Sequence, residues 1–243
     1  MSLTHDRYNV LKSNKYPILI TIGFFLVTTC ISFFYHNFWT IFDQDGLIYL
    51  SAGQQILAGT GNDVSLPNSG PAGPILFAVL EMITNNGLFA TKIVSIFSGT
   101  AIVFFSYHVF RNIFDYRIAI VSQLFIAFNP WIGILSISSQ NDLTPISLAI
   151  ISIYFITKNK LKFFDIIISA SLLGTAFMFR TQPIIFFFAI IIFLILIAKD
   201  KKFKMIGVAL FIIFFILLCS PMLYYNISTH DTLLDSNTNY YIA

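Results

Sequence analysis

Asp45 and Tyr49 lie four residues apart in the segment Asp45–Ala58, whose pattern predicts a short amphipathic helix. At that spacing the two side chains would share one helix face. An aspartate at a helix start is most often an N-cap, and either Asp43 or Asp45 fits that role. A carboxylate held at the membrane surface can instead act as a general base that takes a proton from an attacking hydroxyl. The sequence leaves both interpretations open.

The rest of this predicted helix sets up two further expectations. Its apolar side should be formed by five aliphatic residues: Leu47, Ile48, Leu50, Ile56 and Leu57. Gly59 follows at the position of a C-cap, where a glycine is the usual residue because it tolerates the left-handed conformation.

Asp142 ends the polar run Ser138–Asp142, directly before an apolar segment with Pro145 near its start. An acid followed by an early proline is an ordinary signal for a helix N-terminus, so the simplest interpretation is again a cap. Alternatively, Asp45 and Asp142 could come together from different loops and share a substrate or a divalent metal, because hard cations prefer carboxylate oxygens. The metal and its ligands stay unknown from the sequence.

Lys92 and Arg180 each lie at the edge of a long apolar segment, where an unpartnered cation is costly. The common explanation is that a long side chain reaches to the membrane interface. The alternative is a pair of cations that faces an anionic headgroup such as a phosphate. Arg180 favours the second explanation, because the polar break 180–183 separates two very apolar segments.

The composition shows what these residues are embedded in. Of the 243 residues, 57% are hydrophobic and only 10% are charged. A soluble domain has about 25% charged residues, so soluble enzymes and nucleic-acid-binding domains are excluded. We predict an all-α integral membrane protein, a single module over 1–243, with about seven transmembrane helices. The predicted spans are 17–35, 93–110, 118–137, 143–157, 164–179, 183–198 and 205–223.

The basic residues predict the orientation of these spans. With a cytoplasmic N-terminus, twelve of the 14 lysines and arginines fall on the cytoplasmic side, as the positive-inside rule requires. Lys92 and Arg180 are the two exceptions. The outer side then has a loop at 37–92 with no lysine or arginine before Lys92, and a polar tail at 224–243. We therefore expect a multi-pass cell-membrane protein with its candidate site outside the cytoplasm.

One apolar run, Pro71–Ile83, is too short to cross a bilayer and contains Glu81. Counting it as a span would reverse the orientation of everything after it and place most lysines outside. We predict an interfacial or re-entrant segment on the outer face, so the first loop should hold juxtamembrane helices.

Several of these patterns, in their order along the chain, resemble polytopic GT-C glycosyltransferases. The similarity is to the protein-mannosyltransferase and aminoarabinose-transferase group (family 39-like). The similar features in the first half of the chain are the Asp45–Tyr49 start of the first loop, the proline-bearing segment at 71–80, and Lys92. Those in the second half are Asp142 and the segments Gly174–Pro183 and Ser220–Asn226. The chain departs from that pattern at Gly46, where many relatives have a second acid.

This resemblance implies transfer of a sugar from a polyprenyl-phosphate-linked donor to an acceptor on the extracytoplasmic face. Asp45 would be the catalytic base, assisted by Asp142. Asp43 and Tyr49 would contact substrate, and Lys92 and Arg180 would face the donor phosphate. The acceptor, whether protein, lipid or glycan, stays open, as does a divalent metal. Membrane lipids, and no nucleic acid, are the other expected partners.

Two other classes of function compete with this hypothesis. A transporter or flippase would be expected to have ionisable residues near mid-bilayer and internal repeats, and neither pattern is visible in the sequence. A non-catalytic membrane scaffold or a truncated remnant is favoured by the short chain, since members of this class usually carry further spans. GT-C glycosyltransferases usually have further spans and often a soluble domain after such a region. The other expectation is therefore that 1–243 is the N-terminal part of a longer enzyme.

Overall fold

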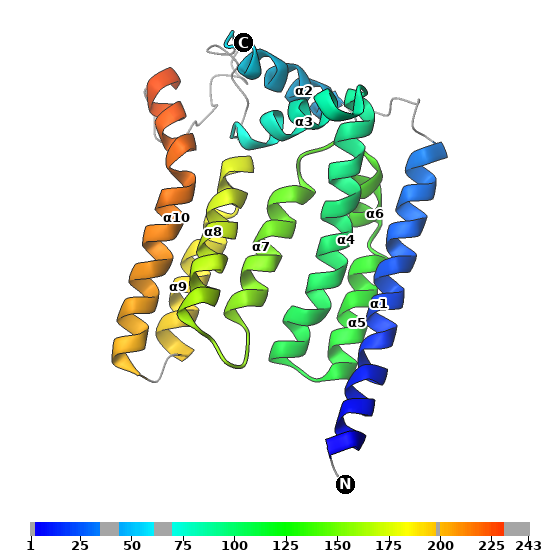
Figure 1. Ribbon diagram of the computed structural model, residues 1–243, viewed down its shortest axis with the longest axis vertical. Coiled ribbons are helices and arrows are strands. Elements are labelled where there is room, and N and C mark those ends of the chain that lie inside the picture. The colour runs from blue at the N-terminus through cyan, green and yellow to red at the C-terminus, as the bar shows by residue number, and fades with distance from the viewer. Residues whose placement is uncertain (1–2, 35–43, 61–69, 198–199, 231–243) are drawn as a thin grey trace.

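The computed structural model describes residues 3–34, 44–60, 70–197 and 200–230, and in this part of the chain helices are joined by short connections (Figure 1). Its helices, in chain order, are α1 (Leu3–Phe34), α2 (Gln44–Leu57), α3 (Ala72–Thr84), α4 (Gly87–Ile113), α5 (Tyr116–Ala127), α6 (Pro130–Ile137), α7 (Leu143–Ile156), α8 (Phe163–Phe179), α9 (Ile184–Ile197) and α10 (Lys201–His230).

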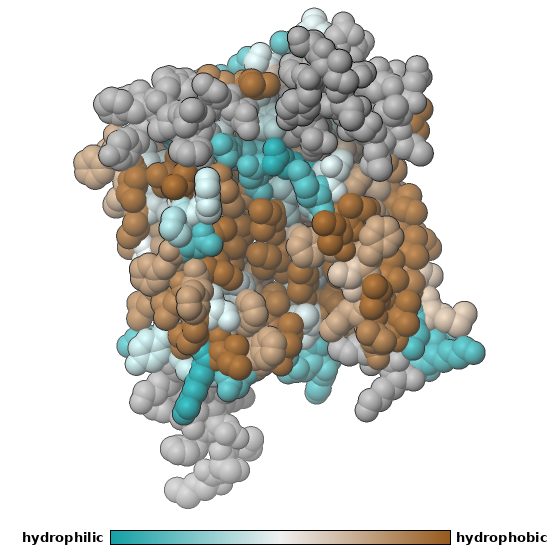
Figure 2. Space-filling view, turned by 180° about the vertical axis from the view of Figure 1, so that it is seen from behind, coloured by the Kyte–Doolittle hydropathy of each residue, from teal (hydrophilic) through white to brown (hydrophobic). Residues whose placement is uncertain are grey.

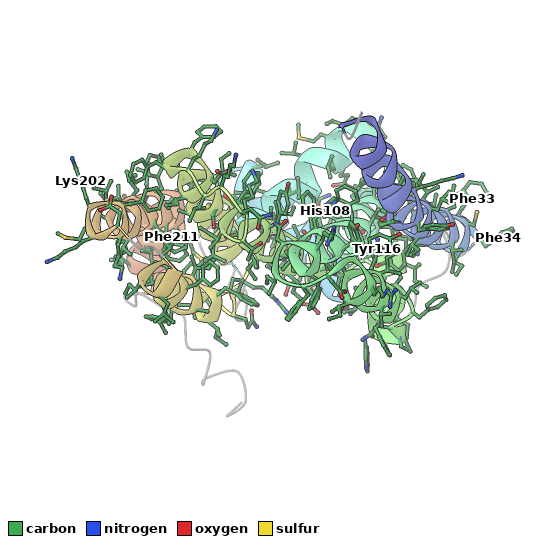
Figure 3. The ribbon with its side chains drawn as sticks, turned by 90° about the horizontal axis from the view of Figure 1, so that it is seen from below. Phe33, Phe34, His108, Tyr116, Lys202 and Phe211 are labelled. Atoms are coloured by element: carbon green, nitrogen blue, oxygen red, sulfur yellow. The ribbon has the colours of Figure 1, made fainter. Side chains whose placement is uncertain are left out.

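Eight of these helices form an upright bundle, and α2 and α3 lie across one end of it (Figure 1). We call this the α3 end. The connections α4–α5 and α7–α8 lie at the opposite end, as do the start of α1, the end of α9 and the start of α10. Viewed from that opposite end, the bundle is elongated, with α1 and its Phe33 and Phe34 at one extreme and α10 with Lys202 at the other (Figure 3).

The number of membrane spans is only partly settled by helix length. Three helical segments in the described residues are long and apolar enough to cross a bilayer: Lys15–Phe34, Gly87–Ile113 and Lys201–Tyr224. A fourth is obtained if α5 and α6, which meet at a bend of 55°, count as one span. The helices α7, α8 and α9 coincide with predicted spans but have 14 to 17 residues, fewer than the roughly 20 that a span needs. Seven spans therefore remain a prediction.

The surface of the bundle is the kind that lipid covers. Figure 2 shows an apolar band over most of its height, with hydrophilic residues at the lower rim and a hydrophilic patch near the α3 end. Large apolar side chains such as Phe125, Phe188 and Leu196 are 76%, 60% and 79% exposed. In water such a surface would drive aggregation, whereas in a bilayer it is the surface that faces the lipid chains.

Between the helices, hydroxyl and amide side chains add polar contacts to the apolar packing. The Ser152 hydroxyl lies 2.7 Å from that of Ser169, which joins α7 to α8. A buried amide joins α5 to α1, because Gln123 Nε2 donates to the Pro17 carbonyl oxygen at 3.0 Å and to Thr21 Oγ1 at 3.1 Å. Such polar contacts are common where lipid supplies no hydrophobic drive for helix association.

Helix α3 agrees with the prediction of a short interfacial segment. Its 13 residues span about 20 Å at 1.5 Å per residue, well short of a bilayer core. Helix α2 ends as predicted, because Gly59 has φ +71°. The Gly59 and Thr60 N–H groups donate to the carbonyls of Ile56 and Gln55, which completes a Schellman C-cap.

The predicted apolar side of α2 was wrong. Leu47, Ile48 and Leu57 are 41%, 56% and 48% exposed, and of the predicted set only Leu50 is buried. The buried face is made instead by Leu50 with small residues and one ring, namely Gly46, Tyr49, Ala52 and Gly53. A Cβ at Gly53 would lie 2.0 Å from the Pro74 carbonyl oxygen. Backbone contact with α3 therefore decides which face is buried, and the larger aliphatic residues point outward.

Candidate active site

The segment Ser138–Asp142, which connects α6 to α7, is the centre of the α3 end. It is polar throughout, yet Ser138, Ser139 and Asn141 are only 3%, 1% and 1% exposed. From one side it is held by α4, because the Ser95 hydroxyl donates to the Gln140 carbonyl oxygen at 3.0 Å. A polar connection that is this well buried must be covered by other elements. Helices α2 and α3 and the end of α8 lie closest to it, as the next contacts show.

Helix α2 reaches the segment through Gly46. A Cβ at this position would lie 2.0 Å from the Ser139 carbonyl oxygen, so only a glycine allows the approach. Asp45, the neighbour of Gly46, lies in the first turn of α2, and its side chain is outside the described part of the structure. The glycine that departs from the GT-C pattern thus has a physical reason, because a second acid would not fit there.

Helix α3 reaches the same segment through Gly73, and Gly70, two residues before this helix, reaches the end of α8. A Cβ at Gly73 would lie 2.3 Å from Asn141 Nδ2, and a Cβ at Gly70 would lie 2.0 Å from the Met178 carbonyl oxygen. The Gly70 N–H also donates to the Phe179 carbonyl oxygen at 3.2 Å. The stretch 70–73 therefore bridges the end of α8 and the start of α7.

Asp142 and Arg180 form an ion pair across this bridge, between Asp142 Oδ1 and Arg180 Nη1. Arg180 follows the end of α8 in an extended conformation. Asp142 occupies the N-cap position of α7 but makes no capping hydrogen bond. The predicted helix start at Asp142 is therefore confirmed, but its carboxylate is used in the ion pair and makes no capping hydrogen bond. Both side chains are partly exposed, at 28% and 23%.

Three polar atoms beside this pair are buried without a hydrogen-bond partner in the described structure. They are Asn141 Oδ1, Asn141 Nδ2 and Arg180 Nε. Asn141 was not among the site residues predicted from the sequence. The signal that could have indicated Asn141 was the run of five polar residues, 138–142, between two apolar segments. Such a run is expected to be either exposed to solvent or part of a functional site.

Lys92 lies on α4, the helix that also holds the 138–142 segment through Ser95. It precedes Ser95 by one helical turn and is only 2% exposed. It also lines a pocket of about 190 Å³ between α1 and α4, whose other lining residues include Phe25, Thr29 and Phe97. This burial contradicts the explanation that Lys92 reaches out to the interface. The predicted closeness of Lys92 and Arg180 stays a prediction.

Comparison with known proteins gives this arrangement a family. Residues 68–225, well over half of the chain, match the family described as dolichyl-phosphate-mannose-protein mannosyltransferase. The chain belongs to that family. No curated protein and no solved structure matches it.

Membership of the mannosyltransferase family, together with the apolar helices, makes this chain a membrane-integral protein and indicates a glycosyltransferase that uses a polyprenyl-phosphate-linked sugar. The GT-C resemblance of the sequence is thereby confirmed. The matched residues include Lys92, Asn141, Asp142 and Arg180, whereas Asp45 lies before them.

Two other predicted substrate residues also precede the matched range. Tyr49 is 6% exposed and packs with Leu50, Phe77 and Val94 in a small apolar cluster under α2 and α3. Asp43 lies outside the described residues. In the part of the chain that the structure describes, no group of three His, Cys, Asp or Glu residues could hold a metal. The roles of Asp43 and Tyr49, and a metal, remain predictions.

Proposed function

We propose that this mannosyltransferase-family protein transfers a sugar from a polyprenyl-phosphate donor to an acceptor at the α3 end of its bundle. The observation that carries the proposal is the convergence of α2, α3, the 138–142 segment and the end of α8 on one place. Gly46, the neighbour of Asp45, contacts the 138–142 segment at Ser139. Asp142, the last residue of this segment, forms the ion pair with Arg180.

The chemistry assigns a role to each group. As the acceptor hydroxyl attacks the anomeric carbon, its proton passes to the Asp45 carboxylate. The bond between that carbon and the phosphate oxygen breaks, and the lipid phosphate leaves with the bonding electrons. Arg180, and Lys92 from the α4 side, stabilise the charge that develops on this phosphate. Asp142 positions the acceptor and holds Arg180 in place until the phosphate arrives.

We further propose that the α3 end faces the extracytoplasmic side. The α4–α5 connection, flanked by Arg111 and Arg117 in these helices, and the α7–α8 connection, which contains Lys158, Lys160 and Lys162, lie at the opposite end (Figure 1). The positive-inside rule puts the cytoplasm there. In a chain without Cys30 and Cys219, Gln55→Cys should react with a membrane-impermeant maleimide added outside intact cells. Lys160→Cys, its control on the α7–α8 connection, should react only after permeabilisation. The reverse pattern would refute the orientation.

The catalytic assignment is tested by Asp45→Asn. Asparagine keeps the size of the side chain, so the change removes the ability to accept a proton and one negative charge in the first turn of α2. We expect transfer from dolichyl-phosphate mannose to fall about 10²–10⁴-fold, the usual contribution of a positioned base. Insertion should be unchanged, and the loss of stability should not exceed about 1 kcal/mol.

Asp115→Asn is the matched control, because Asp115 caps α5 at the opposite end, where its Oδ1 accepts from the Ile118 N–H at 2.9 Å. Transfer by this variant should equal that of the wild type. Normal turnover by a well-folded Asp45→Asn protein would falsify the assignment of Asp45.

A further inference from the structure

The side chain of Asn141 is a buried amide that the proposed mechanism does not use. It is 1% exposed, and within the described structure neither Oδ1 nor Nδ2 has a hydrogen-bond partner. A buried polar group normally has a partner, because leaving it unpaired lowers stability. A group that keeps two unpaired atoms beside an ion pair is a candidate for binding a ligand.

The neighbours of Asn141 hold its amide in one place. Gly73 in α3 packs directly on it, since a Cβ there would be 2.3 Å from Nδ2. The next residue, Asp142, is bound to Arg180, whose own Nε is the third unpaired atom. The partial exposure of Asp142 and Arg180 means that a ligand reaching the ion pair from outside lies next to the amide.

The chemistry of the amide selects the kind of ligand. An amide offers both a donor and an acceptor and carries no charge. A phosphate has only acceptors, so it would leave Oδ1 facing an anion, whereas a sugar hydroxyl both donates and accepts and satisfies both amide atoms. The N–H at Arg180 Nε adds one donor for a second hydroxyl.

We infer that Asn141 and Arg180 Nε bind hydroxyls of the sugar on the lipid-linked donor, next to the place where Arg180 meets the donor phosphate. This inference rests on the proposed function and assigns the sugar-binding group within the same site. It also explains why the free protein keeps a buried amide unpaired, since its partner arrives with the substrate.

The test compares two lipids on the full-length protein in nanodiscs. Dolichyl-phosphate mannose carries the sugar, and dolichyl phosphate lacks it. We expect Asn141→Ala to weaken binding of the mannosyl lipid about three- to tenfold, as for the loss of one or two neutral hydrogen bonds. Binding of dolichyl phosphate should be unchanged, and the melting temperature should fall less than in a buried amide variant that loses hydrogen bonds, because only packing is lost.

Gln123→Ala is the matched control, because Gln123 is a buried amide whose Nε2 already has two partners. It should lower the melting temperature and leave the ratio of the two affinities unchanged.

An unchanged affinity ratio in Asn141→Ala, or an equal loss for both lipids, would overturn the inference. A change confined to the Michaelis constant of the acceptor would overturn it as well, since the hydroxyl would then belong to the acceptor. Failure of the wild-type protein to bind either lipid would count against the proposed function itself, and the two failures are thereby distinguishable.

Discussion

Two ion pairs, one at each end of the bundle, show how differently this protein uses the same chemistry. At the end opposite α3, Asp165 in the first turn of α8 uses both carboxylate oxygens. Oδ1 accepts from Lys158 Nζ at 2.7 Å, and Oδ2 accepts from the Lys162 N–H at 3.1 Å. The Lys158 ammonium also lies 4.2 Å from the centre of the Phe155 ring. Each group of this pair therefore serves the local fold.

The pair at the α3 end is built the other way. Asp142 gives no capping bond to its own helix, although it occupies the N-cap position. Arg180 Nε and both amide atoms of Asn141 have no partner within the described structure. Moreover, the pair joins α7 to the end of α8 instead of stabilising one helix start. Groups that sacrifice local hydrogen bonds in this way are expected where a substrate must be bound.

The contrast also concerns how the backbone is arranged. At the α3 end, Gly46 and Gly70 lie against the backbone carbonyls of Ser139 and Met178, and Gly73 packs on the side chain of Asn141. The opposite end uses ordinary caps, such as Asp115 on α5 and Asp200 on α10. Close backbone contact fixes the relative positions of elements that carry reacting groups, and misplacement by about 1 Å can be costly in catalysis.

The largest difference between the two pairs should appear on removing their cations. Arg180→Gln is expected to weaken binding of dolichyl phosphate about ten- to a hundredfold, the worth of one or two charge-assisted hydrogen bonds. Lys158→Gln should bind this lipid like the wild type. Titration of both purified variants in nanodiscs measures this. Equal affinities for the two variants would mean that the pair at the α3 end is as structural as the other.

Removing a backbone contact should have the next largest effect. Gly46→Ala would force the Ser139 carbonyl away from α2 and shift Asp45 relative to Asp142, so we expect transfer to fall at least about tenfold. Gly133→Ala in α6 is the control, because a Cβ there would have nothing within 4 Å. Rates measured at saturating donor would test this, and a Gly46→Ala enzyme of normal rate would show that the contact is not needed for catalysis.

The sequence alone predicted the elements well. The seven predicted apolar runs coincide with α1, α4, α5–α6, α7, α8, α9 and α10, because hydropathy reports directly on what lies in lipid. The end of α2 at Gly59 and the short α3 were also predicted, since turn chemistry and length are local properties. Whether the shorter helices cross the bilayer is not local, because it depends on flanking residues and on the surrounding lipid.

Asp142 and Arg180 were predicted as candidate site residues, whereas Asn141 was not. Arg180 was expected to lie near Lys92 and to face the donor phosphate, and its ion pair with Asp142 was missed. Partners 38 positions apart in the chain have no periodicity to reveal them. The exposed Leu47 and Ile48 illustrate the same limit, because glycine contacts with α3 and the 138–142 segment decide which side of α2 is buried.

The smallest effect should be on stability, and it should differ between the Asp165 and Asp142 carboxylates. In Asp165→Asn the Lys162 N–H can still donate to the amide oxygen, but the charge beside Lys158 and at the start of α8 is lost. A partly exposed ion pair contributes up to about 1 kcal/mol, and a negative charge in the first turn of a helix about 0.3–1 kcal/mol. We expect a loss of roughly 0.5–1 kcal/mol, with transfer unchanged.

Asp142→Asn, which gives up no capping hydrogen bond, should show the opposite: reduced transfer and a smaller loss of stability. Thermal unfolding in one detergent, together with a transfer assay, measures both quantities. If Asp142→Asn were the less stable variant and Asp165→Asn the less active one, the division between a structural end and a substrate-binding end would be wrong.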